Sequence, residues 1–450
     1  MGRLFGTDGA RGVAITELTC ELAMNIGRAA ACVLTKHTNH RPRILVGKDT
    51  RVSSDVLEAA LCAGICSVGA DVEILGVVPT PAVAYLVRKY GADAGVVISA
   101  SHNTVEYNGI KLFNHEGFKL SDEIEEEIEA LVLDNPQSME LKNGTEIGKV
   151  KYAKWATRDY INYIMRTIPD NLSGMRIAVD CANGSASTTA EDLFIGLGAN
   201  VHLINNKPDG ININENCGST NIEVLSKFVK DNRCHAGVAF DGDADRCIAV
   251  DENGEVVDGD KMLGIFAKTM RQKGELHNNA VVVTVMSNMG FFKFCKENNI
   301  DTAITKVGDR YVLEEMRAKG YNLGGEQSGH IIFLDHATTG DGELSAVQLL
   351  SAMKLSELKM SELADDIERY PQIMINIKIS EFARGNWQED EGICSCISEV
   401  ERELGDDARV LVRESGTEPL IRVMIEGKNF DTINEGAMKI AEVIRQRCPK

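Results

Sequence analysis

Short apolar segments that end in polar loops recur along this chain and constrain its fold more than any other feature. Residues 43–46, 175–180, 234–240 and 280–285 are mostly apolar, which is typical of buried strands. Helical segments separate these strands, and such alternation implies a mainly parallel sheet covered by helices. Sheets of this class bind ligands at the carboxyl ends of their strands, so we expect the polar loops to carry the function.

The rhythm of strand and helix restarts twice and then changes near Pro371. With 450 residues, the chain is too long for a single hydrophobic core. Three strands and a final helix follow Pro371. The apolar face of this helix is formed by Ile433, Ala437, Ile440 and Ile444. We predict three similar mixed α/β domains and a smaller α+β C-terminal domain, at 1–152, 153–254, 255–370 and 371–450.

Composition argues against several classes of partner and location. The net charge of −19 argues against a nucleic-acid partner, because such binding depends on neutralising phosphates. No apolar run approaches the roughly 20 residues that span a bilayer, and the N-terminus lacks the apolar core of a signal peptide. The twelve cysteines are scattered without a C-x-x-C pair, so we expect reduced, buried thiols. We therefore predict a cytoplasmic protein with no membrane partner.

Three carboxylates follow the strand at 234–240. Asp241, Asp243 and Asp245 can converge in a tight loop, where their repulsion would be costly without a cation. Hard oxygen ligands of this kind suit Mg²⁺. An EF-hand is a rival interpretation, but its required glycine is replaced by Arg246 and strand-like sequence flanks the loop. A metal-free surface cluster of acids is the other alternative.

A hydroxyl nucleophile is expected in the loop Ser99-Ala-Ser-His-Asn103, which follows a short buried strand. A Ser–His–Asp hydrolase would need a G-x-S-x-G elbow, which this loop lacks. A phosphorylated serine that completes the coordination of the metal is the other possibility. From the residues alone, either Ser99 or Ser101 could be the nucleophile.

Two further loops suit a sugar phosphate. Residues 413–419 read Arg-Glu-Ser-Gly-Thr-Glu-Pro, whose hydroxyls, backbone N–H groups and Arg413 can wrap an anion. A polar hairpin turn is the plainer interpretation of that segment. Residues 325–330 read Gly-Glu-Gln-Ser-Gly-His, a set that suits sugar hydroxyls or an amino group better than phosphate. His330 could act as an acid or base, although a lone histidine is more often structural.

Five motifs in this order resemble the α-D-phosphohexomutases over essentially the full length of the chain. They are Phe-Gly-Thr-Asp-Gly-Ala-Arg-Gly at 5–12, Ser-Ala-Ser-His-Asn at 99–103, Asp-Gly-Asp-Ala-Asp-Arg at 241–246, and the two loops at 325–330 and 413–419. The resemblance implies three similar α/β domains around a central cleft and a smaller fourth domain. Many relatives have proline after Ser-His-Asn, whereas this chain has Thr104, which casts doubt on the stiffness of the loop.

The resemblance also implies roles for individual residues. Ser101 would be the phosphoserine and, with Asp241, Asp243 and Asp245, would bind Mg²⁺. Arg11, Lys119 and His330 would lie near the transfer centre. Glu326 and Ser328 would select the sugar. The non-reacting phosphate would be held by Arg413, Ser415, Gly416, Thr417 and Arg422.

Gln327 suggests that the chain is most similar to the family members that act on glucosamine phosphates. The implied reaction converts glucosamine 6-phosphate reversibly into glucosamine 1-phosphate through a 1,6-bisphosphate, and feeds UDP-N-acetylglucosamine and cell-wall synthesis. Glucosamine or glucose 1,6-bisphosphate would activate the serine, and a homodimer is expected by analogy. Phosphomannomutase or phosphoglucomutase specificity is the alternative, followed by a metal-dependent sugar-phosphate phosphatase.

Overall fold

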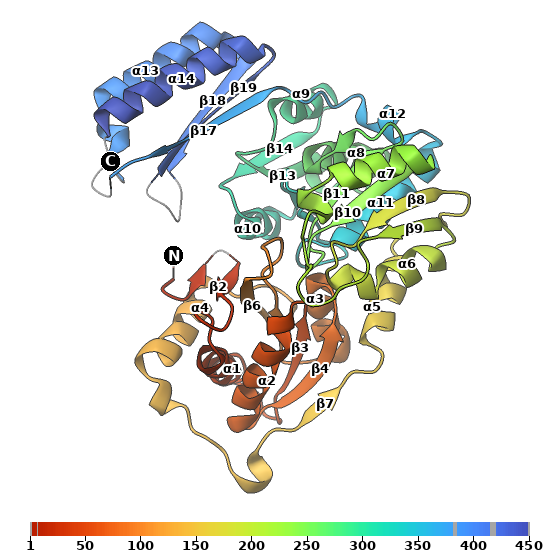
Figure 1. Ribbon diagram of the computed structural model, residues 1–450, viewed down its shortest axis with the longest axis vertical. Helices are drawn as coiled ribbons and strands as arrows, with labels where there is room; N and C mark the ends of the chain where they lie inside the picture. The colour runs from red at the N-terminus through yellow and green to blue at the C-terminus, as the bar shows by residue number, and fades with distance from the viewer. Residues whose placement is uncertain (1, 7, 381–384, 415–419, 449–450) are drawn as a thin grey trace. The chain divides into compact units, whose positions relative to one another are not determined.

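The computed structural model describes residues 2–6, 8–380, 385–414 and 420–448. The chain divides into two compact units. The first comprises Met1–Met286 and Ile300–Asp366, and the second comprises Ser287–Asn299 and Ile367–Lys450. Four sheets are present among the described residues, three in the first unit and one in the second (Figure 1).

The first sheet has seven strands in the order β1-β2-β6-β5-β3-β4-β7. Their bounds are β1 Phe5–Gly6, β2 Gly9–Val13, β3 Arg43–Lys48, β4 Asp71–Val77, β5 Ala94–Ile98, β6 Tyr107–Asn114 and β7 Val150–Tyr152. Strands β5, β3, β4 and β7 pair in parallel, whereas β6 returns antiparallel to β5 and pairs antiparallel with β2. The expectation of a mainly parallel sheet is therefore wrong here, because the strand after the serine loop reverses direction.

Helices cover both faces of this sheet. Their bounds are α1 Cys20–Leu34, α2 Val52–Ser67, α3 Thr80–Tyr90 and α4 Asp122–Glu129. Alternate residues of a strand point to opposite faces. Ile44 and Val46 accordingly join the core formed with α1 and α2, whereas Gly47 lies against Val83 of α3.

The second and third sheets combine parallel strands with an antiparallel hairpin. The second has the order β12-β11-β10-β8-β9 and the third β14-β13-β15-β16. Their strands are β8 Arg176–Asp180, β9 Asn200–Ile204, β10 Ala236–Phe240, β11 Cys247–Asp251, β12 Val256–Val257, β13 Ala280–Thr284, β14 Asp301–Thr305, β15 Leu323–Gly325 and β16 Ile331–Phe333. Their helices are α5 Ala156–Met165, α6 Ala190–Gly196, α7 Glu223–Asn232, α8 Gly259–Lys273, α10 Asp309–Lys319, α11 Gly342–Ser356 and α12 Met360–Ala364.

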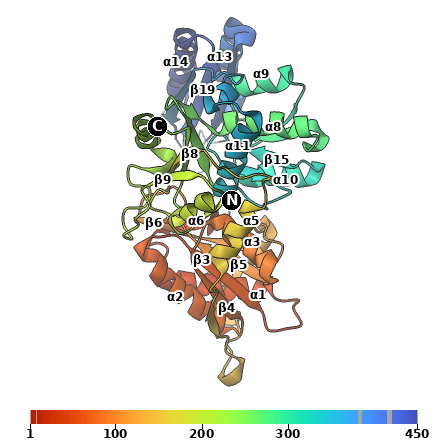
Figure 2. The same ribbon diagram turned by 90° about the vertical axis from the view of Figure 1, so that its right-hand side faces the viewer.

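The second unit contains a three-stranded antiparallel sheet in the order β17-β19-β18. Its elements are α9 Met289–Glu297, β17 Gln372–Lys378, α13 Glu391–Leu404, β18 Ala408–Glu414, β19 Leu420–Gly427 and α14 Phe430–Arg447. Helices α13 and α14 lie side by side on one face of this sheet (Figure 1, Figure 2). The predicted apolar face of the last helix is confirmed, because Ile433, Ala437, Ile440 and Ile444 are all buried. The predicted fold class, three α/β parts and a small α+β part, is confirmed.

The loops singled out in the sequence share one topological position. The serine loop joins β5 to β6, the aspartate loop joins β10 to β11, and the loop with Glu326 joins β15 to β16. Each of these strand pairs is antiparallel. The chain therefore leaves a central strand, presents its polar loop at the strand's carboxyl end and returns beside it.

Two further properties concern the helices and the cysteines. Among the described residues, no helix combines the length and the apolar character that crossing a membrane requires. All twelve cysteines are free thiols, and nine of them are buried.

Close contact between α1 and α2 generates a prediction about stability. A Cβ atom on Gly64 would lie 2.1 Å from the Met24 carbonyl oxygen, so the Gly64→Ala substitution forces the two helices apart. We expect this overpacking to lower the free energy of unfolding by about 1–3 kcal/mol. Denaturant titration measures the change. Ala63→Ser, on the exposed side of the same helix, is the matched control, and an equal effect of both substitutions would contradict the explanation.

Candidate active site

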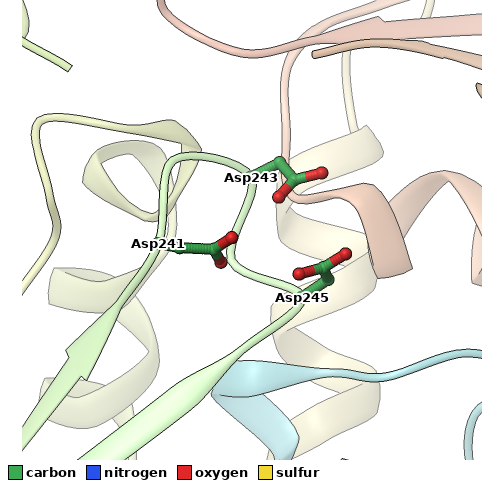
Figure 3. Close-up of side chains that lie close together, drawn as sticks. All are labelled: Asp241, Asp243 and Asp245. Atoms are coloured by element: carbon green, nitrogen blue, oxygen red, sulfur yellow. The ribbon is translucent and has the colours of Figure 1, made fainter. Parts of the chain in front are cut away.

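Three aspartates in the loop between β10 and β11 form the centre of the site. Asp241, Asp243 and Asp245 are buried, and each offers a ligand atom within 4.8 Å of the others. Figure 3 shows their carboxylates turned toward one another. The flanking elements are antiparallel strands rather than helices, which excludes the EF-hand interpretation.

The electrostatics of this cluster fit a divalent cation. Burial and the carboxylates of Asp245 and Asp243 raise the pKa of Asp241 to about 8. The Oδ1 atoms of Asp243 and Asp245 are buried and have no hydrogen-bond partner among the residues that the structure describes. Buried carboxylate oxygens without partners are costly, and a hard cation is the ligand that satisfies them.

Ser101 lies directly against the cluster. Its Oγ donates a hydrogen bond of 2.5 Å to Oδ2 of Asp241, and its side chain is buried. Its φ of 52° is in the left-handed region, which residues other than glycine rarely adopt. The Nδ1 atom of His102 is 3.4 Å from the same Oγ, and burial lowers the pKa of His102 to about 4.

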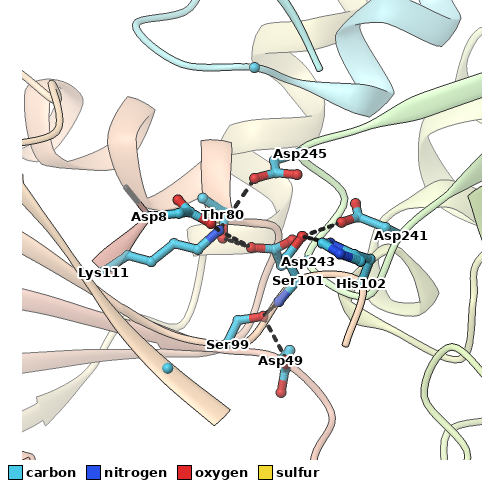
Figure 4. Close-up of polar contacts among 12 residues, drawn as sticks. Asp8, Asp49, Thr80, Ser99, Ser101, His102, Lys111, Asp241, Asp243 and Asp245 are labelled. Atoms are coloured by element: carbon cyan, nitrogen blue, oxygen red, sulfur yellow. Dashed lines mark hydrogen bonds and ion pairs between the residues drawn. The ribbon is translucent and has the colours of Figure 1, made fainter. Parts of the chain in front are cut away.

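Ser99 has a different environment from Ser101. Its Oγ donates to Asp49 Oδ2 at 2.7 Å and accepts the Ser101 N–H at 2.9 Å. Ser99 and Asp49 lie on the side of Ser101 that is away from the cluster of Asp241, Asp243 and Asp245 (Figure 4). The Ser99 hydroxyl thus supports the loop, whereas the Ser101 hydroxyl meets the candidate metal ligands.

Lys111 is a residue of the site that sequence reasoning missed. Its ammonium lies 2.8 Å from Asp243, 3.3 Å from Asp245 and 3.0 Å from Asp8, and its side chain is buried (Figure 4). Burial alone would lower the pKa of Lys111, but the three carboxylates outweigh it and raise the pKa well above its usual value. A lysine inside the apolar strand β6 was the available signal, because such a position otherwise favours an apolar residue.

Lys119 and Arg11, the other basic residues expected at the transfer centre, contact carboxylates outside the aspartate cluster. Lys119 lies 2.6 Å from Asp8 and 2.5 Å from Asp309, and Arg11 pairs with Asp8. Asp8 therefore bridges Arg11, Lys111 and Lys119, a role that its motif did not reveal.

His330 lies between two acids. Its Nδ1 is 3.7 Å from Asp245, and its Nε2 is 3.4 Å from Asp309. The Gly340 N–H donates to Nε2 at 3.1 Å, so the proton of the neutral ring lies on Nδ1, beside Asp245. His330 is thus held next to the candidate metal ligands by a backbone group.

The predicted sugar loop joins β15 to β16 in the same unit. The Glu326 carboxylate accepts the Gly308 N–H at 3.1 Å, while its backbone N–H pairs with the His330 carbonyl at 3.0 Å. Glu326 and Gln327 are half-buried and Ser328 is exposed. These polar side chains are therefore accessible to a ligand.

The predicted phosphate loop belongs to the second unit and is only partly described. Ser415, Gly416 and Thr417 lie outside the described residues. Arg413 and Arg422 are paired directly across β18 and β19, which puts both guanidinium groups on one face of the sheet. Burial and the charge of Arg422 lower the pKa of Arg413. The Arg422 Nε is buried and has no hydrogen-bond partner within the described ranges, so the pair suits an anion.

Models of protein families match four segments of the chain, and all four describe parts of phosphoglucomutase/phosphomannomutase. The alpha/beta/alpha domains I, II and III match residues 2–139, 158–254 and 258–370. The C-terminal domain matches residues 374–443.

Curated relatives similar to this chain over its length are phosphoglucosamine mutases. The one from Acetivibrio thermocellus is 55% identical over 447 residues, covering 99% of this chain and 100% of the relative. The one from Clostridium acetobutylicum is 55% identical over 448 residues, covering 100% of both.

Solved structures share the fold at low sequence identity. A phosphoglucomutase/phosphomannomutase family protein from Burkholderia thailandensis gives a TM-score of 0.81 at 22% identity, covering 98% of this chain and 97% of that chain. The N-acetylphosphoglucosamine mutase of Aspergillus fumigatus, solved with GlcNAc-6P and magnesium, gives 0.68 at 16% identity, covering 98% and 95%.

The carboxylate cluster generates a prediction that does not depend on activity. We expect Mg²⁺ to raise the Tm of the protein, since a ligand at about 100 times its Kd adds about 2.7 kcal/mol of stability. The Asp243→Asn substitution removes one ligand and should abolish this increase, as measured by thermal unfolding with and without Mg²⁺. Asp301→Asn, an exposed site with the same change in charge, should leave it intact. An undiminished shift in Asp243→Asn would contradict the assignment.

Proposed function

This chain belongs to the phosphoglucomutase/phosphomannomutase family, and we propose that it interconverts glucosamine 6-phosphate and glucosamine 1-phosphate through a phosphorylated Ser101. The observation that carries the proposal is the Ser101 hydroxyl, buried and hydrogen-bonded to Asp241 within the aspartate cluster. The relatives named above, with about half of their residues identical, support glucosamine phosphate as the substrate.

The reaction consists of two phosphoryl transfers at one atom. In the first, the bond between phosphorus and Ser101 Oγ breaks and O1 of glucosamine 6-phosphate bonds to phosphorus, so the O1 hydroxyl loses a proton and Oγ gains one. The resulting 1,6-bisphosphate then turns over, the bond between its 6-phosphoryl group and O6 breaks, and that group bonds to Oγ, which gives up its proton while O6 gains one. Glucosamine 1-phosphate leaves and Ser101 is phosphorylated again, so atoms and charge balance over the cycle.

Asp241, Asp243 and Asp245 would hold Mg²⁺, with an oxygen of the Ser101 phosphate as a further ligand. The bound ion would neutralise charge on the transferring phosphoryl group. A hexose 1,6-bisphosphate, glucosamine or glucose, would act as activator by restoring the phosphate whenever it is lost.

Basic residues beside the cluster would guide the transferring group. Lys111, held by Asp243 and Asp8, is the ammonium in direct contact with the metal ligands. Lys119 and Arg11 contact Asp8, which in turn contacts Lys111. The Nδ1 atom of His330 faces Asp245. We therefore assign Lys111 to the transfer centre together with the three residues predicted earlier.

Recognition of the substrate would be divided between two loops. Glu326 and Ser328 would contact the sugar, where a carboxylate suits the ammonium group of glucosamine. Arg413 and Arg422, with Ser415, Gly416 and Thr417, would hold the phosphate that is not being transferred. The two like-charged guanidinium groups lie on one face of the sheet and favour a dianion. They would bind the phosphate without contacting the sugar ring, so the bisphosphate could bind in either of its two orientations.

Other parts of the proposal rest on less specific observations. The free cysteines fit a reducing compartment such as the cytoplasm, and a homodimer stays a prediction by analogy. A metal-dependent phosphatase is the alternative, because the same cluster would serve hydrolysis wherever water reaches the phosphoserine.

The central test uses Ser101→Ala. We expect the substitution to abolish interconversion of glucosamine 6-phosphate and glucosamine 1-phosphate and to remove the covalent phosphate, as read by intact mass. Wild-type protein should turn over glucosamine 6-phosphate faster than glucose 6-phosphate or mannose 6-phosphate and should need a hexose 1,6-bisphosphate. Steady phosphate release without isomerisation would favour the phosphatase, and full activity of Ser101→Ala would overturn the assignment.

The arginine pair generates a separate prediction. Arg413→Gln should raise the KM for glucosamine 6-phosphate about 10- to 100-fold, because charge-assisted bonds to phosphate contribute about 1.5–3 kcal/mol each. Steady-state kinetics over a wide range of substrate concentrations measure this. Arg445→Gln, an exposed residue of α14 with the same loss of charge, is the control and should leave KM unchanged. Equal kinetics of the two variants would refute the phosphate role.

A further inference from the structure

The backbone of Ser101 is held in its unusual conformation from outside its own loop. Two side-chain donors converge on its carbonyl oxygen: Asn214 Nδ2 at 2.8 Å and Arg51 Nη2 at 3.1 Å. The same two groups also bind the Asn103 carbonyl oxygen, at 3.0 and 2.7 Å. Each donor therefore bridges the two carbonyls that flank His102.

Arg51 is itself fixed. It is fully buried, and its Nε donates to Asp49 Oδ2 at 2.8 Å. Its Nη1 reaches the carbonyl oxygens of Thr104 and, at 3.1 Å, Tyr107. The planar guanidinium thus binds carbonyls along the whole loop, a geometry that lysine cannot reproduce. These bonds restrain the loop at Thr104.

Asn214 reaches the loop from a different part of the chain. It lies between β9 and α7, its own φ is 57°, and its N–H donates to the Ala182 carbonyl at 2.9 Å. Its side chain is only 7% exposed. Asparagine tolerates left-handed backbone better than most residues, so the amide is delivered without a large conformational cost.

Gly242 completes the enclosure of the Ser101 carbonyl. A Cβ atom at this position would lie 2.6 Å from that oxygen, so only glycine leaves room for the carbonyl between its donors. The aspartate loop thereby packs directly on the backbone of the serine whose hydroxyl it binds.

We propose that Arg51 and Asn214 form a carbonyl clamp that keeps Ser101 left-handed with its Oγ aimed at Asp241, whether or not Oγ carries a phosphoryl group. The inference rests on the proposed function. Between the two transfers, the unphosphorylated Oγ must keep the position at which it will bond to the returning phosphoryl group. A small displacement of a reacting atom strongly slows such a step. Within the described part of the chain, Arg51 and Asn214 bind the loop through its carbonyl oxygens and neither is hydrogen-bonded to Oγ, so both are positioning residues that act through the backbone.

The test substitutes Asn214 by glycine, which tolerates the same φ and removes the side chain with its amide. We expect kcat to fall about 10- to 100-fold while KM for glucosamine 6-phosphate stays within about twofold, because the amide acts on alignment rather than on sugar binding. Single-turnover phosphorylation of Ser101 by glucose 1,6-bisphosphate, followed by intact mass, should slow to the same extent. Asn214→Asp, which keeps the shape but puts a carboxylate oxygen in place of the donor, should lower kcat at least as much.

Thr50→Val is the matched control. The Thr50 hydroxyl donates to the Asn183 carbonyl at 2.6 Å, another side-chain bond between the first and second α/β parts that does not involve Ser101. This variant should keep wild-type kcat. If Asn214→Gly and Asn214→Asp retain wild-type kcat, or if Thr50→Val loses as much, the clamp is overturned.

Two outcomes separate this inference from the proposed function. A wild-type protein that isomerises no hexose phosphate counts against the proposed function, whereas active wild type with unaffected Asn214 variants counts against the clamp alone. Should the variants fail to fold, crystal structures of the phosphorylated and dephosphorylated wild type decide. A φ near 52° in both forms supports the clamp, and a negative φ in either overturns it.

Discussion

Mutual repulsion among three buried carboxylates is the constraint on which the rest of the site depends. Asp241, Asp243 and Asp245 share one short loop, and two of their oxygens have no hydrogen-bond partner in the described part of the chain. Like charges at this separation interact strongly in a buried site, so the arrangement is stable only with positive charge nearby. Lys111 supplies part of it, and a divalent cation would supply the remainder.

The same cluster determines what the neighbouring hydroxyl can do. Ser101 meets Asp241, whereas Ser99 is engaged with Asp49 and the backbone, so two similar residues have separate tasks. The loop that carries them is anchored by Arg51, which binds carbonyl oxygens up to Tyr107. An internal arginine thus binds the backbone at Thr104, the position where the family resemblance led us to expect proline.

In the second unit the repulsion is between positive charges rather than between carboxylates. Arg413 and Arg422 face one another across two strands, and a phosphate dianion would relieve their repulsion. A chain with a net charge of −19 therefore concentrates positive charge locally where an anion is needed. The acidic cluster of the first unit suits a metal ion, and the basic pair of the second unit suits a phosphate.

Local patterns in the sequence determined the α/β class, the polar loops after strands and the aspartate cluster, because apolar periodicity and runs of like charge depend on near neighbours in the chain. The family resemblance indicated Ser101 rather than Ser99, whereas tertiary structure alone decided that β6 reverses direction and that Lys111, Asp8 and Asn214 join the site. Asp8, Lys111 and Asn214 come from segments that lie far apart in the chain. Their roles depend on burial and on contacts with partners that are distant in the chain. A local sequence pattern cannot predict these contacts, because they form only when distant strands and loops pack together.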